Sequence, residues 1–227
     1  FYTSGRASNE AAYLWQLLAR QYGTNNLPDC SNMCHESSGV ALNESIGIGK
    51  GTVRLEDFDK ADLIVVVGQN PGTNHPRMLS ALKSAKKSGA SVLSINPLKE
   101  TGMRRFRHPQ SPIDMLGAGT QISDDHVDIK VNGDMALFRA IGSIILDKGV
   151  HDMDFINLNT TGFLDYANIA KAVDWGLTED LTGQSRDRIY EISDYFCRSK
   201  RTIVCWAMGI TQHKNSVNTI REIMNDE

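Results

Sequence analysis

The stretch that decides the fold is an aliphatic run, Ala61-Asp62-Leu63-Ile64-Val65-Val66-Val67. A run of this length without polar alternation is typical of a central parallel strand that is buried on both faces. A polar, glycine-containing stretch follows it, Gly68-Gln69-Asn70-Pro71-Gly72-Thr73-Asn74-His75-Pro76. Ligands of parallel sheets lie at the carboxyl ends of the strands, so this loop is the first candidate for a binding site.

A second strand follows after one helix. The apolar spacing predicts a helix from about Pro76 to Gly89, and Ser91 to Ile95 reads as a short strand that Asn96-Pro97 ends. Two strands joined by a helix form a β-α-β unit, whose right-handed crossover makes the strands parallel. The Gly68 loop and Asn96-Pro97 should therefore lie at one edge of the sheet.

The rest of the chain continues the alternation of strands and helices. Further strands are expected at residues 125–131 and 202–206, and helices at residues 8–22, 37–46, 134–147, 182–199 and from about 216. Broken helical segments fill residues 151–176. We therefore predict an α/β fold of three layers with a mostly parallel, Rossmann-like sheet.

The totals exclude some classes of function. A formal charge of −3 gives no electrostatic reason to expect binding to nucleic acid or to an anionic membrane. The longest apolar run, Leu63 to Val67, is of strand length, so no membrane span is predicted. Four cysteines (Cys30, Cys34, Cys197 and Cys205) do not form a disulfide scaffold in 227 residues, which predicts a reducing, cytoplasmic location.

A second candidate site is the loop from Gly23 to His35, which is rich in turn formers and ends in Cys34-His35. The Cys34 thiolate could be a nucleophile, a redox thiol or a soft metal ligand. A structural thiol beside a surface histidine accounts for the same two residues equally well. The residues alone leave these alternatives open.

The strand-end loops favour a nucleotide-like ligand. Residues 68–76 are polar but uncharged, which suits hydrogen bonds to a base and a sugar, although a plain connecting loop would have the same turn residues. The Gly-x-Gly-x-x-Gly fingerprint of nicotinamide sites is absent, and Gly47 to Gly51 breaks the Walker A order, so it reads as a flexible turn. The basic cluster at residues 104–108 is typical of a solvated face, with a role near phosphates as the alternative.

Taken in order, these segments resemble the molybdopterin oxidoreductase family, and within it the formate dehydrogenase-like catalytic subunits. The resemblance runs along nearly the whole chain. It rests on Ser4-Gly5-Arg6-x-x-Asn9-Glu10, Gly23-Thr24-Asn25-Asn26, Met33-Cys34-His35, Asp62 to Gly68, Asn70-Pro71, His75-Pro76, Asn96-Pro97, Thr182-Gly183 and Trp206-Ala207-Met208-Gly209-Ile210-Thr211-Gln212. No single motif decides the match; their order and spacing do.

The resemblance implies roles for individual residues. Cys34 matches the protein ligand of a molybdenum or tungsten ion, and His35 matches the neighbouring group that handles a proton. The cofactor would be a bis-molybdopterin guanine dinucleotide. The residues that match its binding segments are Gly68, Asn70, Pro71, His75, Asn96, Asp134, Met208, Gly209 and Gln212.

Several departures from the family pattern limit these roles. Many relatives have Asp-Pro-Arg where this chain has Asn96-Pro97-Leu98, and an amide accepts more weakly from a ribose hydroxyl than a carboxylate does. Cysteine stands where some relatives carry selenocysteine. Cys30 and Cys34 alone cannot ligate a 4Fe-4S cluster, so the family's cluster is expected only elsewhere in the parent protein.

The implied organisation is that of a piece of a longer chain. It begins at Phe1 without a start Met and stops after a helical pattern. Residues 1–50 would belong to a neighbouring cofactor-binding domain that carries the metal-ligand loop, 51–215 to the dinucleotide domain, and 216–227 to the start of a return segment. We expect the piece alone to be inactive.

The implied function of the parent is two-electron chemistry on a small substrate such as formate. Its expected partners are the missing domains of the same chain and an electron-transfer subunit. The alternatives are a degenerate nucleotide-binding or regulatory domain without metal and, less favoured, a nicotinamide dehydrogenase.

Overall fold

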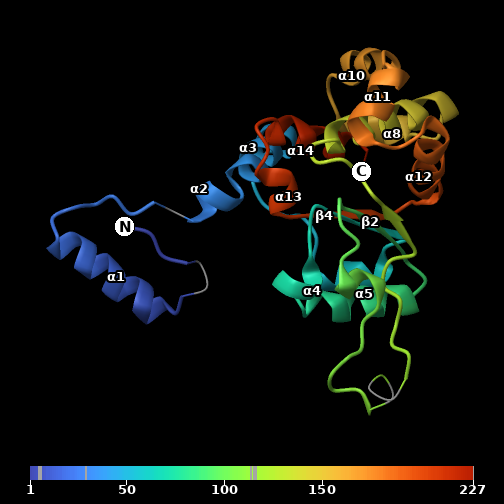
Figure 1. The fold of residues 1–227 in the computed structure, drawn as a ribbon. Coiled ribbons are helices and arrows are strands. Elements are labelled where there is room, and N and C mark those ends of the chain that lie inside the picture. The colour runs from blue at the N-terminus through green and yellow to red at the C-terminus, as the bar shows by residue number, and fades with distance from the viewer. Residues whose placement is uncertain (5–6, 29, 113, 115–116, 227) are drawn as a thin grey trace.

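The computed structural model describes residues 1–4, 7–28, 30–112, 114 and 117–226 (Figure 1). Gly5 and Arg6 of the first quoted motif lie outside the described residues. Among the described residues, no helix is long and apolar enough to cross a lipid bilayer.

The sheet has four parallel strands in the order β3-β2-β1-β4. Their bounds are β1 (Leu63–Val67), β2 (Ser91–Ile95), β3 (Asp125–Val127) and β4 (Thr202–Trp206). Leu63 pairs with Ser91 on one side and with Thr202 on the other, and all five residues of β1 are buried. The aliphatic run is therefore the central strand, and the predicted α/β fold with a parallel sheet is confirmed.

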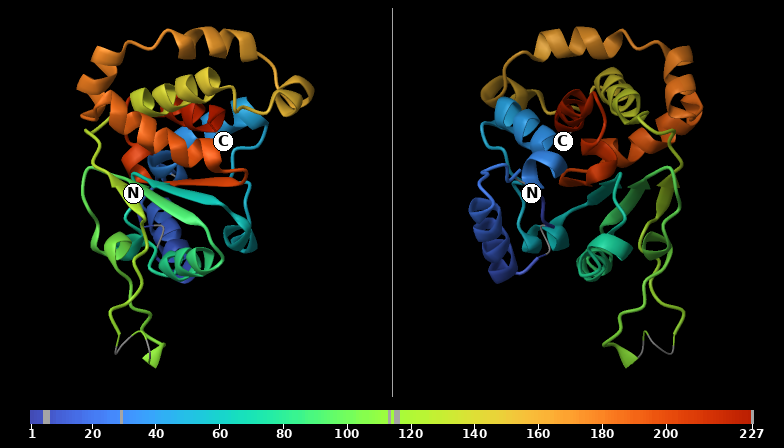
Figure 2. Two further views of the ribbon diagram at one scale, coloured as in Figure 1. Left: turned by 90° about the vertical axis from the view of Figure 1, so that its right-hand side faces the viewer. Right: turned by 60° about the vertical axis from the view of Figure 1, so that its left-hand side comes forward.

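Helices cover both faces of the sheet and make three layers (Figures 1 and 2). One face carries η1 (Leu55–Lys60), α4 (Pro71–Asn74), α5 (Met78–Lys87) and α6 (Thr101–Arg104). Ile64 and Val66 pack there against Leu82. The opposite face carries α8 (Asp134–Lys148), α12 (Arg186–Arg198) and α14 (Ser216–Asn225). Val65 packs there among Phe138 and Ile220, because successive strand side chains point to opposite faces.

The remaining helices surround this body. They are α1 (Asn9–Gln21), α2 (Cys30–Cys34), α3 (Glu36–Ile46), α9 (Met153–Asn159), α10 (Phe163–Lys171), α11 (Trp175–Thr182) and α13 (Met208–Thr211). Helices α9 to α11 form an outer arc beyond α8 (Figure 2), and α10 and α11 contact α8. Helix α1 lies away from the α/β body (Figure 1), whereas α3 packs against α13 and α14.

Several element boundaries differ from the predictions, and the short helices α2 and α13 lie where polar loops were expected. Residues 71–74 form their own short helix, α4, because Asn70 Oδ1 accepts from Thr73 N at 3.2 Å, so the next helix begins at Met78. Thr182 does not begin a helix. Its hydroxyl donates to Thr178 O inside α11, and Ser185 caps α12 instead. The third strand ends at Val127, four residues early, ahead of the left-handed Asn132 (φ 68°).

Candidate cofactor and metal site

The strand order reverses between β1 and β4. The chain passes from β1 outward through β2 to β3, and then returns so that β4 lies on the other side of β1. In open parallel sheets, the crevice beyond the carboxyl ends of two such strands is the usual ligand site. Here the loops that follow Val67 and Trp206 stand at that position, which is therefore the expected place of such a crevice.

Gly68 and Gly209 bring these two loops into backbone contact. Gly209 N donates to Gly68 O at 3.0 Å, and Gly68 N donates to Ile95 O at 3.0 Å. Gly68 has φ +58°, and a Cβ atom there would lie 2.9 Å from Gly209 C. A side chain at either position would force the loops apart, so glycine at both positions allows this backbone contact at the floor of the expected crevice.

The loop after β1 is held by its own polar side chains. Asn70 caps α4 with its Oδ1, and its Nδ2 donates to Glu100 Oε2 at 2.6 Å. Gln69 is nearly buried, and its Nε2 lies 3.3 Å from Nδ1 of the exposed His75. Pro71 is buried at the first position of α4. Asn70 is therefore partly occupied with structural bonds. Gln69, which belongs to the predicted binding loop but was not named as a site residue, has a buried Oε1 without a partner among the described residues.

Asn96 follows β2 at the same edge. Its backbone N donates to Val127 O at 3.1 Å, which extends the pairing of β2 with β3. Its half-buried side-chain amide makes no hydrogen bond within the described part of the chain. That amide is available to a ligand.

Asp134 begins α8 and is buried, with 6% of its surface exposed. Burial raises the pKa of its carboxyl to about 6, against the opposing effects of its own backbone N–H and of His213. Asn215 contacts the next residue of α8, since its Nδ2 is 3.8 Å from Met135 Sδ. The buried Asn215 Oδ1 and Thr211 Oγ1 have no partner among the described residues. Unpaired polar atoms thus gather where the β4 loop meets α8.

The Cys34-His35 segment is bound to the loop after β4. Gln212 Nε2 donates to Met33 O at 2.7 Å, and Ser37 Oγ donates to Thr211 O at 3.2 Å. Cys34 ends α2 and is half-buried as a free thiol, and His35 is exposed. The structure therefore brings the predicted Cys34, His35 and Gln212 to one place, although they are far apart in the sequence. Met208 and Gly209, the first residues of α13 after β4, are exposed.

His35 is oriented through two residues that sequence reasoning did not select as site residues. Trp206 Nε1 donates to Ser38 Oγ at 2.9 Å, and Ser38 Oγ lies 3.3 Å from His35 Nδ1. Because the serine oxygen already accepts from the indole, its hydroxyl hydrogen is available to His35 Nδ1. The contact joins residues 168 positions apart, and no local pattern predicts it.

Across the described residues, no three His, Cys, Asp or Glu side chains gather as a set of metal ligands.

Comparison with known proteins assigns the family. The model of the molybdopterin oxidoreductase family matches residues 1–225. The chain belongs to the molybdopterin oxidoreductase family. The resemblance that the motifs indicated is thereby confirmed.

Relatives of this molybdopterin oxidoreductase chain include an uncharacterized oxidoreductase of Mycobacterium tuberculosis, 50% identical over 99% of this chain and 30% of that protein. Protein YdeP of Escherichia coli is 44% identical over 99% of this chain and 31% of its own length. Formate dehydrogenase H of Escherichia coli is 29% identical over 97% of this chain and 29% of that protein. The chain thus spans about three tenths of the length of these curated relatives.

A solved structure shares the fold. Acetylene hydratase from Pelobacter acetylenicus superposes with a TM-score of 0.69 over 92% of this chain and 26% of that one, at 19% identity. This likeness concerns the arrangement of strands and helices alone.

Proposed function

We propose that the protein containing this chain carries out two-electron oxidation or reduction of a small substrate at a molybdenum or tungsten bis-molybdopterin guanine dinucleotide centre. Formate is the proposed substrate, because a formate dehydrogenase is among the relatives. The observation that carries the proposal is the pair of hydrogen bonds from Gln212 to Met33 O and from Ser37 to Thr211 O. These bonds support the proposal because they tie the segment that carries Cys34 to the loop after β4, where the dinucleotide would lie.

The residues present fit such a group. Gln69 Oε1, Thr211 Oγ1 and Asn215 Oδ1 are buried acceptors without partners in the described chain, close to the strand-end loops. A purine base and a ribose carry N–H and O–H donors that could satisfy them. The backbone contact of Gly68 with Gly209 also leaves no side chain over the floor of the crevice. A nucleotide could therefore approach the main chain closely.

Within this proposal the residues divide into two groups. The first group would border the ligand beyond the ends of β1 and β2, and it consists of Gly68, Asn70, Pro71, His75 and Asn96. The second group would border the ligand near the end of β4 and the start of α8, and it consists of Asp134, Met208, Gly209 and Gln212. There the Asp134 carboxylate would accept hydrogen bonds from the N–H donors of a base. Cys34 would be the protein ligand of the metal. When bound, the metal centre supplies the two-electron oxidation–reduction.

His35 would move the proton that accompanies this chemistry. Its Nδ1 faces Ser38, so Nε2, the other ring nitrogen of this exposed residue, is the atom that would release or take up the proton. Histidine suits this role because its ordinary pKa lies near neutral pH. Trp206 and Ser38 act as positioning residues, since they reach the reaction only through the imidazole.

The remaining parts of the reaction would come from outside this chain. We propose that residues 1–50 contribute to a neighbouring cofactor domain, that 51–215 form the dinucleotide domain, and that residues from 216 onward begin the return segment. Electrons would leave through a 4Fe-4S cluster elsewhere in the parent and pass to an electron-transfer subunit. The chain alone, without those parts, would be inactive.

The full-length protein provides the test. We expect one molybdenum or tungsten atom and two pterin guanine dinucleotides for each chain, measured by elemental analysis and by fluorescence of the oxidised pterin. We also expect formate-dependent reduction of a viologen dye. Pterin without metal would support the degenerate nucleotide-binding alternative, and absence of both would refute the proposal. Bound metal and pterin without formate turnover would refute formate as the substrate but not the metal–pterin centre.

A further inference from the structure

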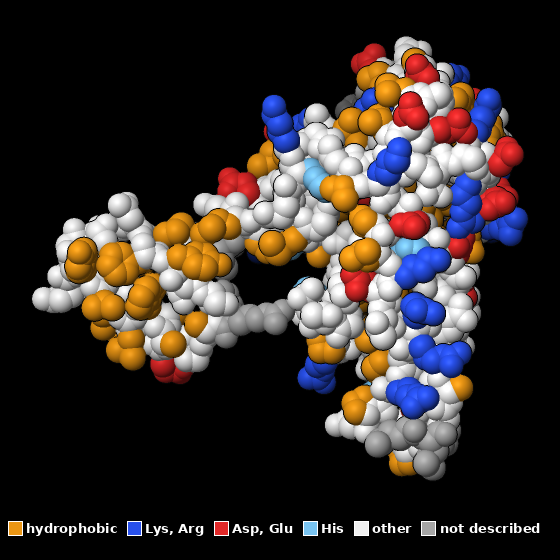
Figure 3. Space-filling model, viewed as in Figure 1, with side chains coloured by type: hydrophobic (Ala, Val, Ile, Leu, Met, Phe, Trp, Pro, Cys, Tyr) orange, Lys and Arg blue, Asp and Glu red, His pale blue; other side chains and the backbone are white. Residues whose placement is uncertain are grey.

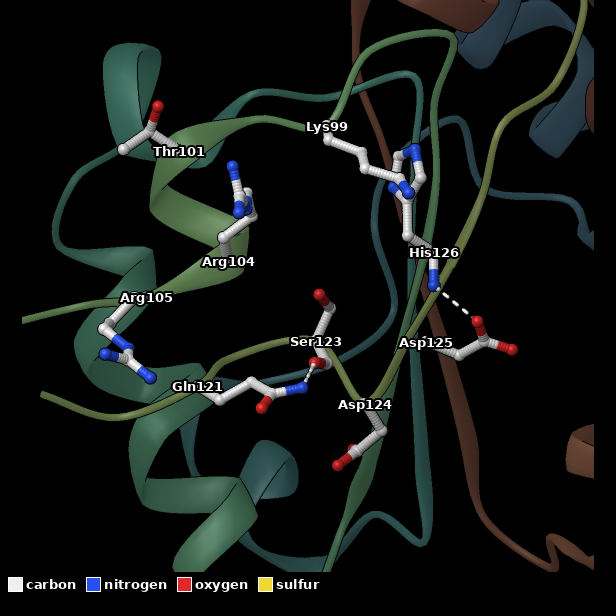
Figure 4. A pocket seen from close by; sticks show the side chains of 9 residues that line it. All are labelled: Lys99, Thr101, Arg104, Arg105, Gln121, Ser123, Asp124, Asp125 and His126. Carbon is white, nitrogen blue, oxygen red and sulfur yellow. Dashed lines mark hydrogen bonds between the residues drawn. The ribbon is translucent and has the colours of Figure 1, made fainter. Parts of the chain in front are cut away.

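A separate pocket of about 670 Å³ lies at the β3 edge of the sheet, and it shares no residue with the strand-end crevice (Figure 4). It lies at the base of the long excursion between α6 and β3, where Phe106 and Thr120 pair as an isolated antiparallel bridge. Its lining residues are Lys99, Thr101, Arg104, Arg105, Gln121, Ser123, Asp124, Asp125 and His126.

The two acidic residues of the pocket are already neutralised. Both carboxylate oxygens of Asp125 accept from Arg188 Nη2 at 2.7 Å. Asp124 forms an ion pair with Lys86, and its other oxygen accepts from Val92 N at 2.7 Å. These carboxylates therefore hold the strand edge together and contribute little negative charge to the pocket.

The three cations of the pocket are not neutralised. Within the described part of the chain, no ion pair or side-chain hydrogen bond engages Lys99, Arg104 or Arg105. Lys99 lies beside His126 on one side of the pocket, and the two arginines lie on the other (Figure 4). Figure 3 shows basic side chains gathered along this side of the molecule, on a chain whose net charge is −3. The pocket is thus a local positive site on an acidic protein.

His126 adds a polar atom that lacks a partner. Its Nδ1 lies 3.3 Å from Ser94 Oγ, while its buried Nε2 has no hydrogen bond within the described residues. Burial, and then the charge of Lys99, lower the pKa of the imidazole, which favours the neutral ring. Gln121 Nε2 and Ser123 Oγ donate to backbone oxygens at 2.9 and 3.1 Å. These bonds fix the part of the pocket wall that Gln121 and Ser123 form.

We propose that this pocket binds a small phosphorylated anion, with Lys99, Arg104 and Arg105 contacting its phosphate oxygens. Guanidinium groups match phosphate with paired N–H donors, and a lysine adds a point charge. The Thr101 hydroxyl lies in the same lining and can donate a further hydrogen bond. The volume falls in the range of small-molecule sites, about 300–1,000 Å³. This inference does not depend on the proposed function.

Isothermal titration calorimetry on the full-length protein with its cofactor tests the pocket. The probes are inorganic phosphate and ribose 5-phosphate, and the tighter of the two shows whether the pocket favours the free ion or a phosphate ester. The double variant Arg104→Gln/Arg105→Gln should weaken binding at least tenfold. Lys99→Gln, a second and independent variant, should weaken it severalfold.

Arg107→Gln is the matched control, because Arg107 is exposed in the same segment but does not line the pocket. It should change the affinity less than twofold. All of these side chains are exposed, so thermal unfolding should be unchanged. The proposal is overturned if neither probe binds, or if Arg107→Gln weakens binding as much as the double variant does.

Discussion

Gly68 and Gly209 lie so close together that a Cβ atom built on Gly209 would be 2.5 Å from Gly68 O. The atoms in the way belong to the main chain, so no side-chain rotation can relieve the contact. The two loops of the strand-order reversal are therefore coupled through glycine at both positions.

Gly209→Ala should consequently destabilise the protein by about 1–3 kcal/mol, which is the usual cost of an overpacked site. Urea denaturation measures this change. Gly39→Ala in α3 is the control, because a Cβ atom there meets nothing within 4 Å. That substitution should leave stability unchanged or raise it by up to about 1 kcal/mol. Equal effects of the two substitutions would contradict the coupling of the loops.

Asp134→Asn should stabilise the cofactor-free protein at neutral pH. Burial raises the pKa of Asp134 to about 6 from 3.8, so the folded state binds the proton more tightly than the unfolded state does. The cost of the buried carboxylate is fully present above pH 6 and vanishes below about pH 4. The gain should reach up to about 3 kcal/mol at pH 7.5 and disappear at pH 3.5. Denaturation curves at the two pH values decide this, and a gain independent of pH would contradict it.

Cys34→Ala should lower formate turnover of the full-length protein by at least about a hundredfold, because loss of a metal ligand exceeds the effect of losing an outer-shell partner. The metal content of the same variant, measured in parallel, shows whether the metal is lost or is retained in an inactive position. Cys197→Ala removes another half-buried free thiol, on α12, and should retain activity. Full turnover by Cys34→Ala would exclude its role as a ligand.

Ser38→Ala should shift the pH profile of turnover and reduce kcat by about tenfold, because it breaks the link from Trp206 to His35. Ser37→Ala, one residue away, removes the bond to Thr211 O and should destabilise the protein by about 1 kcal/mol without moving the pH profile. Identical pH profiles for the two variants would assign Ser38 a purely structural role.

The sequence predicted those parts of the fold that local patterns encode. Strands β2 and β4 match residue for residue, and the aliphatic run is the central strand, because continuous burial leaves a continuous apolar signal. The short helix α4 was missed although Asn70 and Pro71 carry a cap and a first-position proline. The pocket residues Arg104 and Arg105 belong to the basic cluster, and their role could not be predicted. A run of charged residues has the same sequence pattern whether it faces solvent or lines a cavity.

The candidate site was predicted only as far as family resemblance reaches. Ser38 and Trp206 could not be found from sequence, because their contact depends on how α3 packs against the loop after β4. The roles of Cys34, His35 and the loop residues stay predictions until the experiments above are done.

The packing of α3 on α13 and α14 also sets an order of events during synthesis. Ser38 leaves the ribosome 168 residues before Trp206, its hydrogen-bond partner. At about 5–20 residues per second, translation leaves α3 without its docking surface for roughly 10–30 s. During that interval the buried residues of α3, Ala41 among them, lack their packing partners on α14. The Cys34-His35 segment therefore reaches its final place only when α13 and α14 have been made.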